Sequence, residues 1–276
     1  MYLFNRSKVV LCLLLAMTFS SSTLVQANES SQLQDIINGE HRSEENKQRD
    51  IYRHPLQTLT FFQIKPEMKV VEVWPGKGWY TEILAPYLKN GGQFIAAGFP
   101  QHAGPQWRQD MQVEYQHWLS VSPTLYDKVN VVELGPPSHW SVGPDDSVDA
   151  VLTFRNVHNW LKGGYDSEMF NAFYRVLKPG GILGVTDHRA AINTDIEEMK
   201  TSGYLAQALV ITLAEKAGFI LEETSEVNAN YTDTKDYSSG VWTLPPTLRL
   251  GEQSREQYLK IGESDRMTLR FRKPKE

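Results

Sequence analysis

The chain has 276 residues, of which 41% are hydrophobic and 22% are charged, the balance of an ordinary globular protein and not of a disordered or membrane-embedded one. Its formal net charge is −5 at pH 7, which argues against nucleic acid as the usual partner. The only cysteine, Cys12, lies in the N-terminal segment. The rest of the chain therefore cannot form a disulfide.

The first 27 residues have the features of a cleaved secretory signal. Arg6 and Lys8 precede an apolar run, and Val25-Gln26-Ala27 places small residues where a signal peptidase cleaves. The apolar run is short for a membrane span, so an uncleaved anchor is the weaker alternative. We therefore expect cleavage after Ala27 and a periplasmic or secreted protein that is not membrane-bound. The mature chain would carry 26 Lys and Arg against 33 Asp and Glu, a formal charge of −7.

After this signal (1–27), residues 28–48 are mostly polar and predict an N-terminal arm, and residues 49–276 predict one domain. Strands and helices alternate along that domain, which predicts a parallel sheet with helices on both faces. The predicted strands are 70–73, 94–97, 129–133, 150–154, 182–186, 219–227 and 267–272. The predicted helices are 53–62, 79–88, one within 105–119, 166–177 and 203–217. Ligands of such sheets bind at the carboxyl ends of the strands.

The end of the first predicted strand carries the most informative motif. A valine-rich run from 70 to 73 predicts a buried strand, and apolar residues recur at helical spacing from 80 to 88, where Pro86 should kink or end the helix. Between them lies Trp74-Pro75-Gly76-Lys77-Gly78. The two glycines would let backbone N–H groups approach a ligand near a helix N-terminus, although they could also form only a tight turn.

Two common nucleotide motifs fit this turn poorly. A P-loop needs Ser or Thr after its lysine, but Lys77 is followed by Gly78. A dinucleotide fingerprint needs a third glycine, where this chain has Thr81, and an acid after the second strand, which ends in Gly98-Phe99-Pro100. Nucleoside triphosphates are therefore disfavoured, and a nicotinamide cofactor is a distant alternative. Glu72 favours another ligand, since a carboxylate in an apolar strand is costly unless it is paired or contacts a ligand.

The stretch from Glu72 to Tyr80 resembles motif I of the class I S-adenosylmethionine-dependent methyltransferases, in the form found in a bacterial group of predicted methyltransferases with a signal peptide. Arg155 to Trp160 resembles that group's fourth-strand end, and Leu177 to Gly181 the turn before its fifth strand. The resemblance covers roughly residues 50–274. It implies an α/β, Rossmann-like fold with a seven-stranded, mostly parallel sheet. The last two strands, with no clear helix between them, would form an antiparallel pair at one edge.

The resemblance also implies S-adenosyl-L-methionine as the cofactor. The residues expected to contact it are Glu72, Trp74, Pro75, Gly76, Gly78, Tyr80, Gly98, Glu133, Arg155 and Asn156. Aromatic faces can stabilise a sulfonium by about 0.5 to 2 kcal/mol, and Trp74 is less easily explained as core than Tyr80. Two departures stand out: Trp74 occupies the position of a motif glycine, and no carboxylate ends the second strand. Glu133 could equally be a solvated loop acid.

Methyl transfer is an in-line displacement, so a general base is needed only if the acceptor carries a proton. His158 and His188 both follow predicted strands, and either could be that base or a buried structural histidine. Asp187-His188-Arg189 concentrates polar groups after an apolar strand, so Asp187 and His188 are expected to contact the acceptor more than His158. The remaining histidines are scattered, and no metal motif is predicted.

The resulting expectation is an exported S-adenosylmethionine-dependent methyltransferase with a small-molecule acceptor. The alternative is a catalytically silent protein on the same scaffold that binds a small ligand or nucleoside, which the missing acid after the second strand favours. Arg53-His54-Pro55 also resembles a segment of the bacterial group, and it could either close the pocket or cap a helix.

Overall fold

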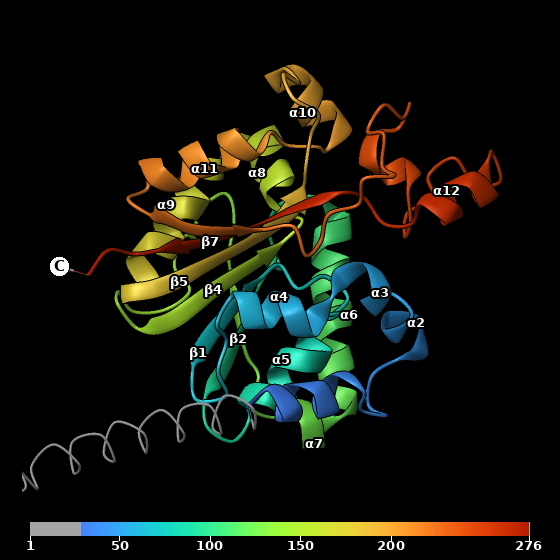
Figure 1. Cartoon of the computed structure of the whole chain (residues 1–276). Helices are drawn as coiled ribbons and strands as arrows, with labels where there is room; N and C mark the ends of the chain where they lie inside the picture. Colours follow the sequence, from blue (N-terminus) through green and yellow to red (C-terminus); the bar gives the residue numbers. More distant parts are fainter. Residues whose placement is uncertain (1–28, 276) are drawn as a thin grey trace, which may run out of the picture.

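The computed structural model describes residues 29–275, which form a seven-stranded sheet between two layers of helices (Figure 1). The strands are β1 (Lys69–Val73), β2 (Gln93–Gly98), β3 (Asn130–Glu133), β4 (Val148–Phe154), β5 (Leu177–His188), β6 (Ile220–Ser225) and β7 (Arg266–Arg272). The helices are α2 (Glu44–Lys47), α3 (Asp50–Arg53), α4 (Pro55–Phe61), α5 (Thr81–Leu88), α6 (Gln106–Val121), α7 (Pro123–Tyr126), α8 (Val157–Gly163), α9 (Asp166–Val176), α10 (Ile196–Ser202), α11 (Gln207–Lys216), α12 (Arg255–Ile261) and the 3₁₀-helix η1 (Gly240–Thr243), preceded by helical residues 29–37.

The strand order is β3-β2-β1-β4-β5-β7-β6. The first five strands pair in parallel, and β7 pairs antiparallel with both β5 and β6. The predicted sheet with an antiparallel pair at one edge is therefore confirmed. The chain runs outward from β1 to β3 and then crosses back to β4, so the order reverses beside the carboxyl end of β1. That point is where ligands of open parallel sheets bind.

Both faces of the sheet are buried, because successive side chains of a strand point to opposite faces. Val71 and Val73 of β1 pack in the core under α8, α9 and α11, whereas Val70 packs in the core under α4, α5 and α6. Figure 1 shows these two groups of helices on opposite faces of the sheet. The β-branched run read from the sequence is thus a central strand, and its carboxyl end is held rigidly between the two layers.

The N-terminal segment helps to complete α5. The helix continues past Pro86 to Leu88, although proline lacks the N–H that would donate to the carbonyl of Glu82. His41 Nε2 donates to that carbonyl instead, at 2.9 Å. Leu33, from the helical residues 29–37, packs in the core beneath α5. The expectation that Pro86 kinks or ends the helix is therefore wrong as to its end, and His41 supplies a donor in place of the missing N–H.

β5 is longer than the predicted strand 182–186. It runs from Leu177 to His188, with a register shift against β4 that spans the predicted turn at 178–181. β7 pairs with it as far as His188, opposite Arg266. The expectation that Asp187 and His188 follow the strand was wrong, because this antiparallel neighbour extends the hydrogen-bonded ladder by two residues.

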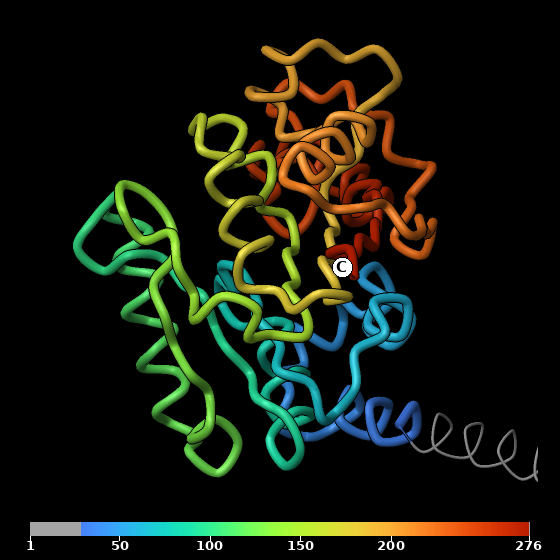
Figure 2. Tube along the Cα trace, turned by 90° about the vertical axis from the view of Figure 1, so that its left-hand side faces the viewer, coloured from blue at the N-terminus to red at the C-terminus, as the bar shows by residue number. Residues whose placement is uncertain are grey.

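The region between the later strands holds short helices that the sequence did not reveal. α8 and α10 were not predicted, and the predicted helix 203–217 begins only at Gln207, after a left-handed turn at Gly203. The segment joining β6 to β7 contains η1 and α12, so the expectation of no helix there was wrong. Figure 2 shows α10 and its neighbours, in orange, at the top of the molecule and the blue N-terminal helix at the bottom.

No helix within residues 29–275 is both long enough and apolar enough to cross a membrane. The predicted signal and its cleavage site after Ala27 lie outside the described residues.

Candidate functional site

The turn between β1 and α5 contains two glycines with positive φ, and they serve different purposes. Gly78, at φ 82°, packs against α6, because a Cβ added there would lie 2.7 Å from the ring of Trp118. Gly76, at φ 61°, faces open space, with no atom within 4 Å of such a Cβ. Both were expected to approach a ligand. The geometry assigns the open position to Gly76 and a packing contact to Gly78.

The aromatic residues of the motif belong to the protein core. Trp74 is 5% exposed, its Nε1 donates to the Leu134 carbonyl at 2.8 Å, and its ring packs on Phe99. Tyr80 stacks on Phe154 with ring centroids 3.5 Å apart. The expectation that Trp74 is hard to explain as core was wrong, because its one polar atom finds a backbone acceptor after β3.

An aromatic cavity of about 380 Å³ opens beside Trp74 at the carboxyl edge of the sheet. Its walls include Trp107, Arg108, Asn159 and Tyr165. The Arg108 guanidinium lies over the Trp74 ring, 4.6 Å from its centroid. Because Asn159 Nδ2 also donates to His158 Nε2 at 3.1 Å, the cavity borders the candidate catalytic histidine.

Glu72 is buried under α5 and is part of a chain of polar side chains. Thr81 donates to Glu72 Oε2 at 3.1 Å, and the Thr81 hydroxyl lies 3.0 Å from that of Tyr115. Burial raises the pKa of Glu72 to about 8, although the hydrogen bond from Thr81 opposes that shift. The carboxyl group is therefore mostly protonated at pH 7, and it can donate a hydrogen bond rather than attract a cation. Thr81, the residue that departs from the dinucleotide fingerprint, is its partner.

The ends of β2 and β3 are occupied by contacts within the protein. The side chain of Gln112 fills the space over Gly98, where an added Cβ would clash, and its Oε1 accepts from the Phe99 amide at 3.1 Å. One oxygen of Glu133 accepts from the Gln101 amide at 3.0 Å, and the other lies 2.9 Å from His139 Nε2. Both carboxylate oxygens of Glu133 thus have partners, so this acid holds the loop after β2 in place.

The carboxyl ends of β4 and β5 bring together the three predicted catalytic residues. Asp187, which is fully buried, accepts from the amides of Val157 at 2.7 Å and His188 at 2.8 Å. Its Oδ1 also lies 3.0 Å from His158 Nδ1. If His158 Nδ1 carries the proton, Nε2 is left as the basic atom of that ring. This is the arrangement of a base held in place by a carboxylate.

The ring of His188 lies beside this pair, 5.3 Å from that of His158 between centroids. Its Nδ1 lies 2.5 Å from Ser264 Oγ. Burial lowers the pKa of His188 well below its usual value, and electrostatic interactions with His158 and Arg155 add to this effect. His188 is therefore neutral at pH 7 and a weaker base than a solvated histidine.

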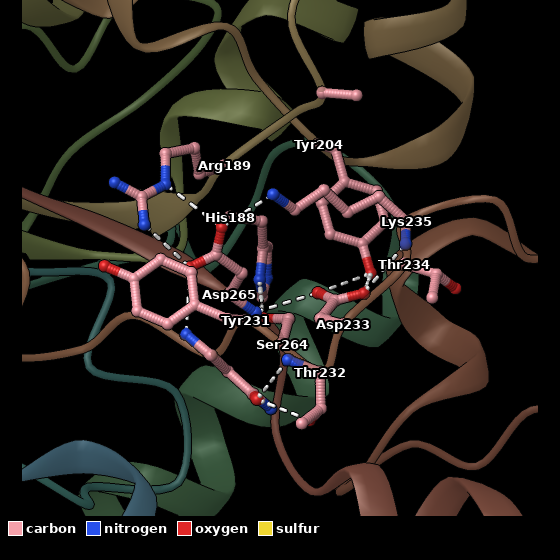
Figure 3. Close-up of polar contacts among 12 residues, drawn as sticks. His188, Arg189, Tyr204, Tyr231, Thr232, Asp233, Thr234, Lys235, Ser264 and Asp265 are labelled. Carbon is pink, nitrogen blue, oxygen red and sulfur yellow. Dashed lines mark hydrogen bonds and ion pairs between the residues drawn. The ribbon is translucent and has the colours of Figure 1, made fainter.

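The segment before β7 closes over His188 (Figure 3). The side chain of Asp233 accepts from the Tyr204 hydroxyl at 3.0 Å and from the Asp265 amide at 2.8 Å. Asp265 in turn accepts from Arg189 Nε at 3.0 Å. Figure 3 shows these groups around His188, with Ser264 between His188 and Asp233. Arg189 thus binds the segment before β7, and its guanidinium is not directed at the proposed acceptor site.

His158, Asp187 and His188 could each offer one ligand atom to a metal, since these atoms lie within 4.8 Å of one another. The local charge disfavours a cation, however. Asp187 already accepts three hydrogen bonds, and the positive charges that lower the pKa of His188 would also repel an ion. The group is better suited to moving a proton than to holding a metal.

Arg155 and Asn156 follow β4 next to the turn. Asn156 Nδ2 donates to the Val73 carbonyl at 2.8 Å, so it joins β4 to the carboxyl end of β1. Arg155 has φ 63°, its amide donates to the Thr186 carbonyl at 2.7 Å, and its side chain is partly exposed. The site also contains charged residues that the sequence did not predict, namely Arg49, Glu263 and Arg266. The one sequence signal for this region was the segment Arg53-His54-Pro55, which was expected either to close the pocket or to cap a helix.

No family model matches the chain, and no curated protein matches it. Among solved structures, it is similar to an S-adenosylmethionine-dependent methyltransferase from Aquifex aeolicus, with a TM-score of 0.53 and 17% identity over 82% of this chain and 92% of the other. It is also similar to a phosphoethanolamine N-methyltransferase 2 from Haemonchus contortus, in complex with S-adenosyl-L-methionine. The TM-score is 0.52 and the identity 17%, over 81% of this chain and 53% of the other. A third similar structure is that of a protein described as a [4+2]-cyclase, with a TM-score of 0.54 and 16% identity over 81% of both chains. The chain thus has the Rossmann-like fold of these methyltransferases, and the cyclase shows that the fold alone does not fix the reaction.

The raised pKa of Glu72 predicts a pH dependence of stability. The folded state retains a proton that the unfolded chain loses near pH 4.5, so the free energy of unfolding should fall as the pH rises from about 4.5 to 8, by at most about 1.4 kcal/mol per pH unit. Glu72→Gln should flatten this decline, because an amide does not titrate. Urea unfolding of the parent and of Glu72→Gln at pH 5, 6.5 and 8 measures the free energy of unfolding of each. Parallel curves for the two proteins would show that Glu72 is ionised in the folded state.

Proposed function

We propose that the protein is an S-adenosylmethionine-dependent methyltransferase that acts on a small-molecule acceptor. The observation that carries the proposal is the open position of Gly76, in a turn directly before α5 and beside the strand-order reversal. Within residues 29–275, the amides of Gly76 and Lys77 donate to no backbone carbonyl, whereas that of Gly78 donates to the Pro75 carbonyl at 3.0 Å, so the first two can meet a ligand. The fold shared with known methyltransferases supports the choice of cofactor.

The aromatic cavity is suited to the adenosyl part of the cofactor. Trp107, which is 53% exposed, supplies an apolar ring at its wall, and the cavity lies at the carboxyl ends of the strands beside Trp74, two residues before Gly76. With the adenine in this cavity, the sulfonium would lie toward His158, because Asn159 lines the cavity and contacts that histidine. Neither Glu133 nor Gly98 would need to bind the ribose, which accounts for the missing acid after β2.

Asp187 and His158 form the proposed base. Asp187 holds the imidazole by its Nδ1, so that Nε2 can take a proton from the acceptor as the methyl group is transferred. His188, whose pKa is lowered, would orient the acceptor or His158 rather than accept the proton. We therefore propose His158, in place of His188, as the base.

A second candidate function is ligand binding without turnover. It is favoured by the partnered oxygens of Glu133 and the filled space over Gly98, which remove two of the expected cofactor contacts. The two functions are separated by incubating the protein with labelled S-adenosylmethionine and a panel of small phenols, amines and thiols. Formation of the demethylated cofactor above the spontaneous rate supports an enzyme. Tight cofactor binding with no product would leave the binding protein.

Gly76→Val should weaken binding of S-adenosylmethionine at least tenfold, because the side chain would fill the space that the turn leaves open to the ligand. Gly251→Val is a matched control, since Gly251 has the same φ of 61° and equally open surroundings. Calorimetric titration gives both affinities. If the two variants bind the cofactor as the parent does, the turn has only a structural role.

His158→Ala should lower the methylation rate by roughly 10² to 10⁴ while cofactor affinity stays within a few fold, because a base acts on the acceptor and not on the donor. His188→Ala should have a smaller effect on the rate. Initial rates at saturating cofactor, together with calorimetric affinities, distinguish the two positions. A larger loss at His188 than at His158 would reverse the assignment.

We also propose that the protein is exported and cleaved after Ala27, on the strength of Arg6, Lys8 and the short apolar run that follows. The mature protein should begin at Asn28 in the periplasmic or secreted fraction, as read by mass spectrometry of its N-terminal peptide. Export would require a supply of cofactor outside the cytoplasm. A chain that begins at Met1 in the cytoplasmic fraction would refute export.

A further inference from the structure

Four arginines converge beside the proposed site, and we refer to Arg49, Arg53, Arg155 and Arg266 as the arginine cluster. They come from α3 and its N-terminal flank, the end of β4 and the start of β7. Three of them bind one buried acid, Glu263. The nitrogen–oxygen distances to its carboxylate are 2.7 Å from Arg49 and 3.1 Å from both Arg53 and Arg266.

The charges of this cluster do not balance. Glu263 is the common partner of three guanidinium groups, and Asp187 is a second carboxylate that favours the charge of Arg155. Although burial favours its protonated form, Arg53, Arg266 and Arg155 hold the pKa of Glu263 far below its usual range. Burial lowers the pKa of Arg155 to about 10; Glu263 opposes this shift, and Arg49 and Arg266 add to it. Buried like charges are costly unless an anion joins them.

The cluster also has hydrogen-bond donors without acceptors. Among the residues that the structure describes, Arg49 Nη2, Arg53 Nη2 and Arg266 Nε are buried without a partner. Arg53 and Arg266 are each 3% exposed, so water does not readily satisfy them. Within residues 29–275, the side chain of Arg155 makes no hydrogen bond, and Arg49 and Arg155 are the two members that retain some exposure. Guanidinium groups in this state are suited to a carboxylate or phosphate.

The cluster lies next to the reacting groups. Arg266 is opposite His188 in the β5–β7 ladder, and Arg155 is three residues before His158. The guanidinium of Arg53 lies 4.6 Å from the ring centroid of Trp79, in the turn that follows Gly78. An anion held by the cluster would therefore be beside both the cofactor turn and the proposed base.

The net charge of the cofactor has the wrong sign to balance the cluster, and only its carboxylate carries the matching charge. S-adenosylmethionine carries a carboxylate, an ammonium and a sulfonium, so its net charge is positive, and the cluster would repel the intact molecule. We propose that the arginine cluster binds an anionic group, a carboxylate or phosphate, of the methyl acceptor. This rests on the proposed methyltransferase function and narrows its substrate class. Binding of the anion would also offset the repulsion of the sulfonium and so favour assembly of the ternary complex.

Inorganic phosphate serves as the probe for the first experiment. It should bind the protein in calorimetric titration, both alone and in the presence of saturating S-adenosylhomocysteine. Arg155→Gln should weaken phosphate binding at least tenfold, since this side chain is partly exposed and, unlike that of Arg49, has no hydrogen bond within the protein to lose. Arg175→Gln, on the exposed face of α9, changes the net charge equally and should bind phosphate as the parent does. Failure of phosphate to bind, or equal loss in both variants, would overturn the proposal.

The second experiment separates the acceptor from the cofactor's own carboxylate. S-adenosylhomocysteine has that carboxylate and 5′-methylthioadenosine lacks it, so their affinities are compared in the parent and in Arg155→Gln. Unchanged affinity for both compounds supports an acceptor anion. Selective weakening of S-adenosylhomocysteine, or its competition with phosphate, would assign the cluster to the cofactor and overturn the proposal. If neither adenosyl compound binds the parent, the methyltransferase function fails, and phosphate binding alone decides whether the anion site exists.

Discussion

The carboxylate of Asp187 is the contact on which the candidate site depends. It is fully buried at the end of β5, and it accepts hydrogen bonds from the first amide of α8, from the next residue of its own strand and from His158. A buried carboxylate is stable only when such donors surround it. One side chain therefore fixes where α8 begins, how the ring of His158 is oriented and how β4 and β5 end relative to each other.

Charge is distributed unevenly around that centre. Glu72 lies in a buried polar chain and is mostly neutral at pH 7. The arginine cluster, by contrast, carries more positive charge than Glu263 offsets. Burial lowers the pKa of His188, and the charges of Arg155, Arg266 and Arg53 add to this effect. Within residues 29–275, the cluster also has buried N–H groups without acceptors. These features match a pocket that is completed by an anion rather than one that is complete in itself.

Segments distant in sequence build this pocket together. Arg49 and Arg53 come from the helices before β1, and Glu263 and Ser264 come from the segment before β7. Figure 1 shows α3 and α12 on the same side of the sheet, toward which the parallel strands point. The segment that joins β6 to β7 is thus part of the site. Ser264 contacts His188, and the hydrogen bond between Asp233 and the Asp265 amide holds the chain around Ser264.

The sequence by itself determined the sheet. A valine-rich run, glycines in the following turn and regular alternation of strands and helices specify a central parallel strand and its ligand-facing end, because these patterns are local and periodic. It also selected His158, Asp187 and His188, which the fold does bring together. The role of each residue was decided only by tertiary contacts. The strand limit at His188 depends on β7, the difference between Gly76 and Gly78 depends on Trp118, and the arginine cluster depends on three separate segments meeting. Burial and charge at these positions come from neighbours distant along the chain, which no local pattern encodes.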